Sequence, residues 1–166
     1  MTMLADAMAV AQGVSDPELP MLTLADLGVL RDVREEDGRV IVSITPTYTG
    51  CPAMDTMRDD LVHALRNAGH DDVEVRTVLA PPWSSDWITE DGKRKLAEAG
   101  IAPPGEARQR PPGPVPLTLA LPVRPVRCPR CGSPDTGEVS RFSATACKAL
   151  RRCRACREPF EHVKEI

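Results

Sequence analysis

The feature that most restricts how this chain can fold is a set of four cysteines arranged as two Cys-x-x-Cys pairs. The pairs are Cys128/Cys131 and Cys153/Cys156, and 21 residues separate them. Two residues between thiolates let a tight turn direct both sulfurs at one ion, and two such turns complete a tetrahedral zinc site. The spacing therefore predicts a zinc-ribbon-like C-terminal domain with zinc on these four cysteines.

This C-terminal region is too small to be stabilised by apolar packing alone. It spans residues 128–166, and its few apolar side chains are chiefly Val139, Phe142, Ala146, Leu150 and Phe160. A domain of fewer than ~40 residues usually needs a metal, disulfides or a partner to fold. Because four cysteines fill the coordination sphere and leave no position for water, we expect a structural rather than a catalytic zinc.

A fifth cysteine, Cys147, lies six residues before Cys153 and leaves alternatives open. Cys147 could replace one of the paired cysteines, and an iron–sulfur cluster could use four of the five thiols. The glycine and the basic residues beside the pairs favour zinc there, with Cys147 as a reduced, partly buried thiol. The nearby basic run could contact nucleic acid. With only Phe142 as a neighbouring aromatic, however, a solvated face or a surface for an acidic protein partner is favoured.

The composition changes just before the cysteine-rich region. Residues 102–127 hold eight of the seventeen prolines, and proline disfavours helices and central strands because it fixes φ and lacks a backbone donor. We therefore predict a first domain over 1–101, a proline-rich linker over 102–127 and the four-cysteine domain over 128–166. Within the linker, the alternating residues 117–121 leave an edge strand open. The last part is basic, with eight Lys/Arg and five Asp/Glu, although the whole chain has a net charge of −3.

The first domain has the pattern of a small α+β fold, a sheet with helices on one face. Apolar residues recur at helical spacing in some segments and alternate in others. Asp37-Gly38 is a hairpin signal between two of the alternating segments. In chain order, the expected elements are a helix over 5–12, strands over 29–33 and 40–45, a helix over 52–67, a strand over 73–79 and a helix over 89–99.

The sixth cysteine, Cys51, stands alone between Gly50 and Pro52 at the predicted start of the 52–67 helix. Because proline is favoured at the first helical position, Cys51 is the expected N-cap, facing free backbone N–H groups and the positive end of the helix dipole. That position would lower the pKa of the thiol and allow it to attack an electrophile or ligate a soft metal. The alternative is a small, inert packing residue, and the residues alone do not decide between the two.

The composition also bears on the compartment. No apolar run approaches the ~20 residues that a membrane-spanning helix needs. The N-terminal residues lack the basic flank and long apolar stretch of a signal peptide. We therefore expect a cytoplasmic protein with no membrane partner, in a compartment where clustered cysteines bind metal more often than they form disulfides. Homo-oligomerisation stays open.

Three short motifs occur in order in the first domain: DPELP with ADLGVL, then TPTYTGCP, then VLAPPW. With these motifs, the domain resembles the iron–sulfur assembly domains related to bacterial SufT and to eukaryotic cytosolic assembly factors. The resemblance implies that the acidic turn and the TGCP cysteine meet on one face. It thus implies a functional thiol site of Asp16, Glu18, Thr49 and Cys51. Transient iron or an iron–sulfur cluster stays open as a cofactor, and whether Cys51 ligates iron or is structural also stays open.

Nearly the whole chain is similar to the PaaD family of accessory proteins of the bacterial phenylacetyl-CoA epoxidase, with CPRCGS, FSATACKAL and CRACREPF carrying the resemblance in the C-terminal part. The resemblance implies a helper of an aerobic aromatic-degradation oxygenase. That complex has a di-iron catalytic subunit and a reductase with a 2Fe–2S centre and flavin. This chain has no Glu-x-x-His pattern for di-iron and no glycine-rich nucleotide loop. We therefore expect no catalytic residues and neither of those two subunits.

Two functions stay open after this reading. In the first, the chain is a maturation factor that helps to assemble an iron–sulfur or metal centre. Cys51 is then the working thiol, and the zinc domain docks the client, especially the iron–sulfur reductase. In the second, the chain is a stable, non-catalytic subunit of the epoxidase, and Cys51 is structural. A zinc-ribbon nucleic-acid binder is a third and weaker alternative.

Overall fold

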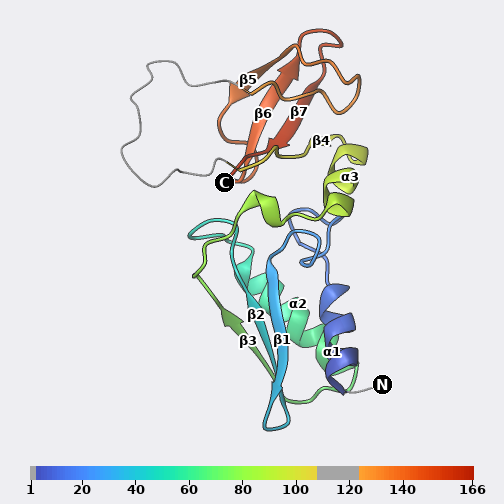
Figure 1. The fold of residues 1–166 in the computed structure, drawn as a ribbon, viewed down its shortest axis with the longest axis vertical. Helices are drawn as coiled ribbons and strands as arrows, with labels where there is room; N and C mark the ends of the chain where they lie inside the picture. The colour runs from blue at the N-terminus through green and yellow to red at the C-terminus, as the bar shows by residue number, and fades with distance from the viewer. Residues whose placement is uncertain (1–2, 108–123) are drawn as a thin grey trace.

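Two β-sheets, one in each half of the chain, form the framework of the protein (Figure 1). The structure is a computed structural model, and it describes residues 3–107 and 124–166. In chain order, the elements are α1 (Met3–Gln12), β1 (Leu30–Glu36), β2 (Arg39–Ile44), α2 (Met54–Asn67), β3 (Val73–Thr77), the 3-10 helix η1 (Ser85–Trp87), α3 (Glu90–Glu98), β4 (Ile101–Ala102), β5 (Thr136–Ser140), β6 (Lys148–Cys153) and β7 (Pro159–Val163). The strand order is β1-β2-β3 in the first sheet and β4-β7-β6-β5 in the second.

The first sheet combines an antiparallel hairpin with a parallel strand. The hairpin turns at Asp37-Gly38, as the sequence predicts, and both residues have a positive φ. Strand β2 then runs parallel to β3, and α2 makes the connection between them. In register, Val42 lies opposite Val33 on one side and Val75 on the other. Because side chains alternate along a strand, apolar residues of all three strands share one face.

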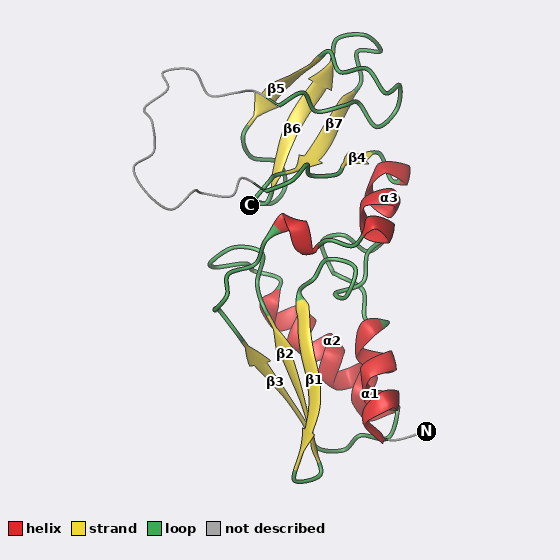
Figure 2. Ribbon diagram, viewed as in Figure 1, coloured by secondary structure: helices red, strands yellow, loops and turns green. Residues whose placement is uncertain are grey.

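Helices α1 and α2 cover that face (Figure 2). On α2, the buried residues Met57, Leu61 and Leu65 recur every four positions, which is the spacing of one helical stripe. On α1, Ala7 and Ala11 are completely buried. The prediction of a small α+β sheet with helices on one face is therefore confirmed. Within the described residues, no helix combines the length and apolar character needed to cross a membrane.

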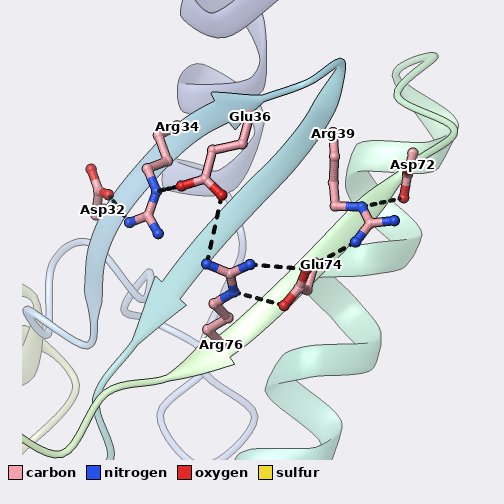
Figure 3. A network of polar contacts seen from close by, with 7 residues as sticks. All are labelled: Asp32, Arg34, Glu36, Arg39, Asp72, Glu74 and Arg76. Atoms are coloured by element: carbon pink, nitrogen blue, oxygen red, sulfur yellow. Dashed lines mark hydrogen bonds and ion pairs between the residues drawn. The ribbon is translucent and has the colours of Figure 1, made fainter.

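Charged side chains cover the opposite face of the first sheet (Figure 3). Ile41 on β2 lies on this face, between Arg34 on β1 and Glu74 on β3, yet it is only 1% exposed. Arg76 contacts Glu74 at 2.6 Å and Glu36 at 3.8 Å, so these ion pairs reach from β3 to β1. Exposed ion pairs contribute only about 0–1 kcal/mol each. The main effect of the network is therefore to shield Ile41 from water, as long arginine side chains can.

The second sheet contains a strand contributed by the end of the first half. Strands β5, β6 and β7 are antiparallel neighbours, and β4 adds to β7 in parallel, with Ile101 opposite Glu161 and Ala102 opposite His162. Strand β4 lies at the predicted boundary between the first domain and the linker. The chain thus enters the second sheet before most of the proline-rich segment. The edge strand considered over 117–121 lies outside the described residues.

The C-terminus of the chain returns to the first domain. The Ser85 N–H group donates to the Ile166 carbonyl at 3.0 Å, and the Ile166 N–H group donates to Ser85 Oγ at 3.1 Å. Val163 on β7 belongs to the same buried apolar cluster as the first-domain core. The two halves are thus joined by hydrogen bonds, by β4 and by shared apolar packing.

Several predicted boundaries need correction. Helix α2 begins at Met54 rather than Pro52, because a turn from the Cys51 carbonyl to the Met54 N–H group precedes it. Strand β3 ends at Thr77 rather than at residue 79. The N-cap of α3 is Thr89, as predicted, and its side chain accepts a hydrogen bond from the Gly92 N–H group at 3.0 Å.

The expected apolar core of the C-terminal region is also smaller than the sequence suggests. Phe160 is buried, but Val139 and Phe142 are 61% and 63% exposed. Cys128 and Cys153 take part in the buried cluster beside Phe160. A sheet with so little apolar packing strengthens the physical argument for a metal in this domain.

Candidate functional site

The four paired cysteines gather where β6 ends, and we call them the zinc cluster: Cys128, Cys131, Cys153 and Cys156. Their Sγ atoms all lie within 4.8 Å of one another, with Cys128 and Cys156 3.7 Å apart and Cys131 and Cys153 3.6 Å apart. A tetrahedral zinc ion with Zn–S bonds of ~2.3 Å places sulfurs about 3.8 Å apart. An iron–sulfur cluster would separate thiolates on different irons by its inorganic core. The arrangement therefore fits one ion.

Main-chain groups prepare the zinc cluster for a metal. The φ of Gly132 is 73°, and its N–H group donates to the Cys128 carbonyl at 2.9 Å, which closes the first turn. The Cys156 N–H group points at Cys153 Sγ at 3.5 Å. This hydrogen bond is the main cause that lowers the pKa of Cys153 to about 7. The pKa of the neighbouring Cys156 moves the opposite way, to about 12: the Glu158 N–H group lowers it, but burial and the thiols of Cys153, Cys131 and Cys128 raise it more. Thiols this close cannot all ionise by themselves, and a bound cation would favour the thiolate at each of them.

A second group of candidate functional residues lines a small cavity at the junction of the two halves, which we call the thiol cavity. The three motifs of the first domain contribute to its lining: Asp16 and Glu18 come from DPELP, Tyr48 and Cys51 from TPTYTGCP, and Trp83 from VLAPPW. The volume of the cavity is about 30 Å³. That volume can hold water or a single ion, whereas pockets for organic ligands measure roughly 300–1,000 Å³. The structure thus brings together three of the four residues of the expected thiol site.

Cys51 is not the helix cap that the sequence predicts. The N-cap of α2 is Ala53, and the half-buried Cys51 lies before it. Burial raises the pKa of the Cys51 thiol, the Ala53 N–H group lowers it, and the nearby charges of Asp16 and Glu18 raise it again. The predicted lowering of this pKa is therefore wrong. Desolvation and neighbouring negative charge outweigh the backbone contribution at this position.

Asp16 presents a buried carboxyl group to the thiol cavity. It is 3% exposed, and its Oδ1 accepts hydrogen bonds from the Glu18 and Leu19 N–H groups at 2.8 and 2.7 Å. Burial raises the pKa of Asp16, while these two N–H groups lower it. The hydrogen bonds hold the acidic turn against the cavity and so fix where the carboxylate lies.

Thr49 does not line the cavity, in contrast to the other three residues of the expected thiol site. It is exposed at the tip of a turn, next to Gly50, whose φ is 85°. Thr47 and Tyr48 occupy the cavity wall instead. The turn therefore directs Thr47 and Tyr48, rather than Thr49, toward the cavity.

The second half of the chain also contributes to the thiol cavity. Thr145, Cys147 and Val163 line it, and Thr145 Oγ1 lies 3.1 Å from Cys147 Sγ. Cys147 stands apart from the zinc cluster among the described residues. Its position beside the Cys51 cavity was missed by reasoning from the sequence. One signal was available: four of the six cysteines suffice for one ion, which leaves a single unassigned cysteine in each half.

Several basic residues of the second half are paired with other groups of the ribbon, although the side chains of Arg152, Arg154 and Arg157 stay exposed. Lys148 is buried and lies 2.9 Å from Glu161, and Arg154 lies 3.2 Å from Asp135. The Arg152 guanidinium donates to a main-chain carbonyl at 3.1 Å. Nucleic-acid binders carry basic residues clustered on one face, often with aromatic side chains for stacking on single strands. The pairings therefore use part of the basic charge within the ribbon itself.

Comparison with known proteins agrees with both halves of the fold. Residues 4–77 match the family described as iron–sulfur cluster assembly protein, and residues 112–164 match the family described as PaaD zinc beta ribbon domain. The crystal structure of a domain of unknown function, DUF59, from Bacillus anthracis is 29% identical, with a TM-score of 0.52. The matched region covers 57% of this chain and 91% of the DUF59 chain. The class is therefore an iron–sulfur-assembly-type domain joined to a zinc ribbon.

Longer relatives narrow this class. A protein of Escherichia coli (strain K12), provisionally named as one of the subunits of 1,2-phenylacetyl-CoA epoxidase, is 40% identical over 156 residues, which cover 94% of this chain and 89% of that protein. The Fe-S protein maturation auxiliary factor YitW of Bacillus subtilis (strain 168) is 34% identical over 91 residues, or 54% of this chain and 88% of that protein. The chain belongs to the PaaD family.

Proposed function

We propose that this protein is a non-catalytic maturation factor of a multicomponent phenylacetyl-CoA epoxidase, and that it assists assembly of an iron–sulfur or metal centre in that system. The observation that carries the proposal is the joining, in one chain, of an iron–sulfur-assembly-type domain to a PaaD zinc ribbon. One relative is named as an epoxidase subunit and another as a maturation factor. A dedicated assembly factor for the epoxidase accounts for both relationships.

In this proposal the two halves have separate tasks. Cys51 is the working thiol, with Asp16 and Glu18 lining the same cavity and Thr49 exposed on the adjoining turn. Its raised pKa means that a metal must displace a proton, which weakens binding and suits transfer to a client. The zinc cluster is structural, and its domain docks the client, for which we propose the iron–sulfur reductase. We place the working domain in residues 1–101, the linker in 102–127 and the docking domain in 128–166, all in the cytoplasm.

The test is to produce the epoxidase components in cells with wild-type protein, with no protein and with Cys51→Ser. The purified reductase is then analysed for iron and labile sulfide. We expect low iron and sulfide without the protein and with Cys51→Ser, and full content with the control Thr56→Ser, a conservative change at an exposed position of α2. A normal cluster content with Cys51→Ser would make this thiol structural.

The name of the Escherichia coli relative favours one alternative, a stable subunit of the epoxidase. A subunit stays in the purified active complex in fixed ratio, and its removal abolishes activity. A maturation factor can be removed after assembly without loss of activity. Gel filtration of the active epoxidase, followed by quantification of this chain in the active fraction, distinguishes the two.

A further inference from the structure

A groove with a volume of about 490 Å³ runs along β5 and the end of β6, beside Cys153 of the zinc cluster. Strand β5 lies at the opposite edge of the described sheet from β4, the strand that the first half contributes (Figure 1). We call this the arginine groove, after its lining of Gly137, Glu138, Val139, Arg152, Arg154 and Arg157. We propose that it is the docking site for an acidic segment of a partner protein. The inference deepens the proposed function and rests on it, because it assigns the docking role of the ribbon to one surface.

The three arginine side chains of the groove are exposed, and each keeps hydrogen-bond donors for a ligand. Arg152 uses its Nε to donate to the Arg157 carbonyl at 3.1 Å. Arg154 pairs with Asp135 at 3.2 Å, yet its side chain is still 71% exposed. Among the described residues, no hydrogen bond or ion pair engages the Arg157 side chain. Because a guanidinium has five N–H donors, most of the donors in the groove stay available.

The charge of the groove fits an acidic ligand. Its three arginines share the lining with one carboxylate, that of Glu138, which lies 3.9 Å from the guanidinium of Arg151. The groove therefore has an excess of positive charge, and guanidinium groups bind carboxylates through paired hydrogen bonds. The segment 108–123 contains no Asp or Glu and cannot serve as an acidic occupant. The acidic ligand is therefore expected on another protein.

The backbone at Arg157 is an independent sign that its side chain has a function. Arg157 follows Cys156 of the second Cys-x-x-Cys turn, as Gly132 follows Cys131 of the first. Both residues have a positive φ, 66° at Arg157 and 73° at Gly132. Glycine adopts this conformation without strain, whereas arginine does not. The second turn thus has arginine where glycine would suit the backbone, and such an outlier supports a functional role for the side chain.

Gly137 leaves space in the groove for a ligand. It lies within β5, opposite Arg152, and its φ is outside the left-handed region, so the backbone does not require glycine there. A Cβ added at Gly137 would lie 3.5 Å from Nη2 of Arg154. A glycine inside a strand often marks a place where a ligand approaches the backbone closely. Val139, which is 61% exposed, adds an apolar contact beside the charges.

These features fit a protein segment better than a nucleic acid. Proteins that bind single strands combine a basic groove with aromatic side chains on which the bases stack. None of the described residues that line the arginine groove is aromatic, and the whole chain has a net charge of −3. Protein interfaces, in contrast, are enriched in arginine around an apolar centre.

The groove can be tested on the purified, zinc-loaded full chain by fluorescence anisotropy. The probe is a short fluorescein-labelled peptide of Glu and Ser with one Val, and the comparison peptide has Gln in place of every Glu. We expect the Glu peptide to bind at least tenfold more tightly than the Gln peptide. Its affinity should fall as the salt concentration rises, because salt screens exposed charges.

Two variants and one control locate the binding. Arg157→Gly should weaken binding of the Glu peptide about tenfold, yet it should keep its zinc and its thermal midpoint, because glycine suits a positive φ. Gly137→Val should also weaken binding, since its side chain occupies the groove while valine favours a strand. The matched control Arg66→Gln removes the same charge from an exposed position of α2 and should bind as the wild type does.

Three outcomes would overturn the inference: equal binding of the two peptides, equal losses in Arg157→Gly and Arg66→Gln, or a single-stranded oligonucleotide that binds through Arg157 more tightly than the Glu peptide does. Zinc content identifies any variant that has failed to fold. In cells, Arg157→Gly should also lower the iron and sulfide content of the reductase. Normal content with this variant would show that the groove does not dock the client, and the maturation role would stand. Normal content without the protein would remove the maturation role but leave the peptide binding intact.

Discussion

The zinc cluster and the thiol cavity both collect cysteines, but they do so in different ways. In the zinc cluster, short turns direct pairs of cysteines that have two residues between them, and the packing of the two turns against each other completes the set. In the thiol cavity, Cys51 and Cys147 meet only because the ribbon packs on the first domain. The first arrangement is encoded by local spacing, whereas the second depends on the docking of two domains. Their responses to mutation should differ accordingly.

The largest effect should come from breaking the zinc cluster. Cys153 is completely buried, and Cys153→Ser should remove the zinc and unfold the ribbon, because the free energy of metal binding, about 10–16 kcal/mol for structural zinc, is folding free energy. Zinc analysis and thermal unfolding measure this. Cys147→Ser is the matched control and should keep its zinc. Zinc that survives Cys153→Ser but not Cys147→Ser would show that the ligand set is different.

A core deletion in the first domain should destabilise without affecting zinc. Leu61 on α2 is completely buried against the sheet, and Leu61→Ala should cost about 2–5 kcal/mol in the free energy of unfolding. Urea denaturation followed by circular dichroism measures the loss. The adjacent exposed change Asp60→Ala should stay within about 0.5 kcal/mol of wild type. Loss of zinc from the folded Leu61→Ala protein would mean that the two halves are more tightly coupled than their chemistry suggests.

A pair of glycines tests how closely the turn before β1 packs against η1, with the glycine of the β1–β2 hairpin as the control. Gly28 and Gly38 both have a positive φ, 70° and 82°, so Ala is strained at either position. At Gly28, an added Cβ would lie 2.6 Å from the Trp87 Cβ, whereas nothing lies within 4 Å at Gly38. Overpacking should therefore make Gly28→Ala about 1–3 kcal/mol less stable than Gly38→Ala. Equal denaturation midpoints for the two variants would show that the Trp87 segment moves aside easily.

The smallest effect concerns the reactivity of Cys51. Burial and nearby negative charge raise its pKa, so at pH 8 less of it is thiolate, and its alkylation by iodoacetamide should be slower than that of a free thiol. Asp16→Asn should lower this pKa and speed alkylation by up to about tenfold, the effect of one pKa unit. Peptide mass spectrometry over a pH series gives the rate at Cys51 alone. Asp60→Asn should leave the rate unchanged, and an equal acceleration there would rule out a local effect of Asp16.

Much of the first domain could be predicted because its signals are local. Asp37-Gly38 specifies a hairpin through its positive φ values, and the repeat of Met57, Leu61 and Leu65 specifies the buried face of a helix. The error at Cys51 has an equally local cause. Proline at position 52 fits a helix start, but a preceding turn ends at Met54 and moves the N-cap to Ala53. Such competition between a turn and a helix is settled by the packing around it.

The residues themselves were enough to specify the two Cys-x-x-Cys turns, the order of the three helices and of the first three strands in the first domain, and the need of a small ribbon for metal. These depend on spacings of a few residues, where backbone geometry leaves few alternatives. The tertiary structure decided that β4 joins the ribbon sheet, that Thr49 faces solvent and that Cys147 faces the cavity of Cys51. Each of these depends on contacts between segments far apart in the chain. No periodicity encodes such contacts, because they arise only when the apolar surfaces of the two halves pack together.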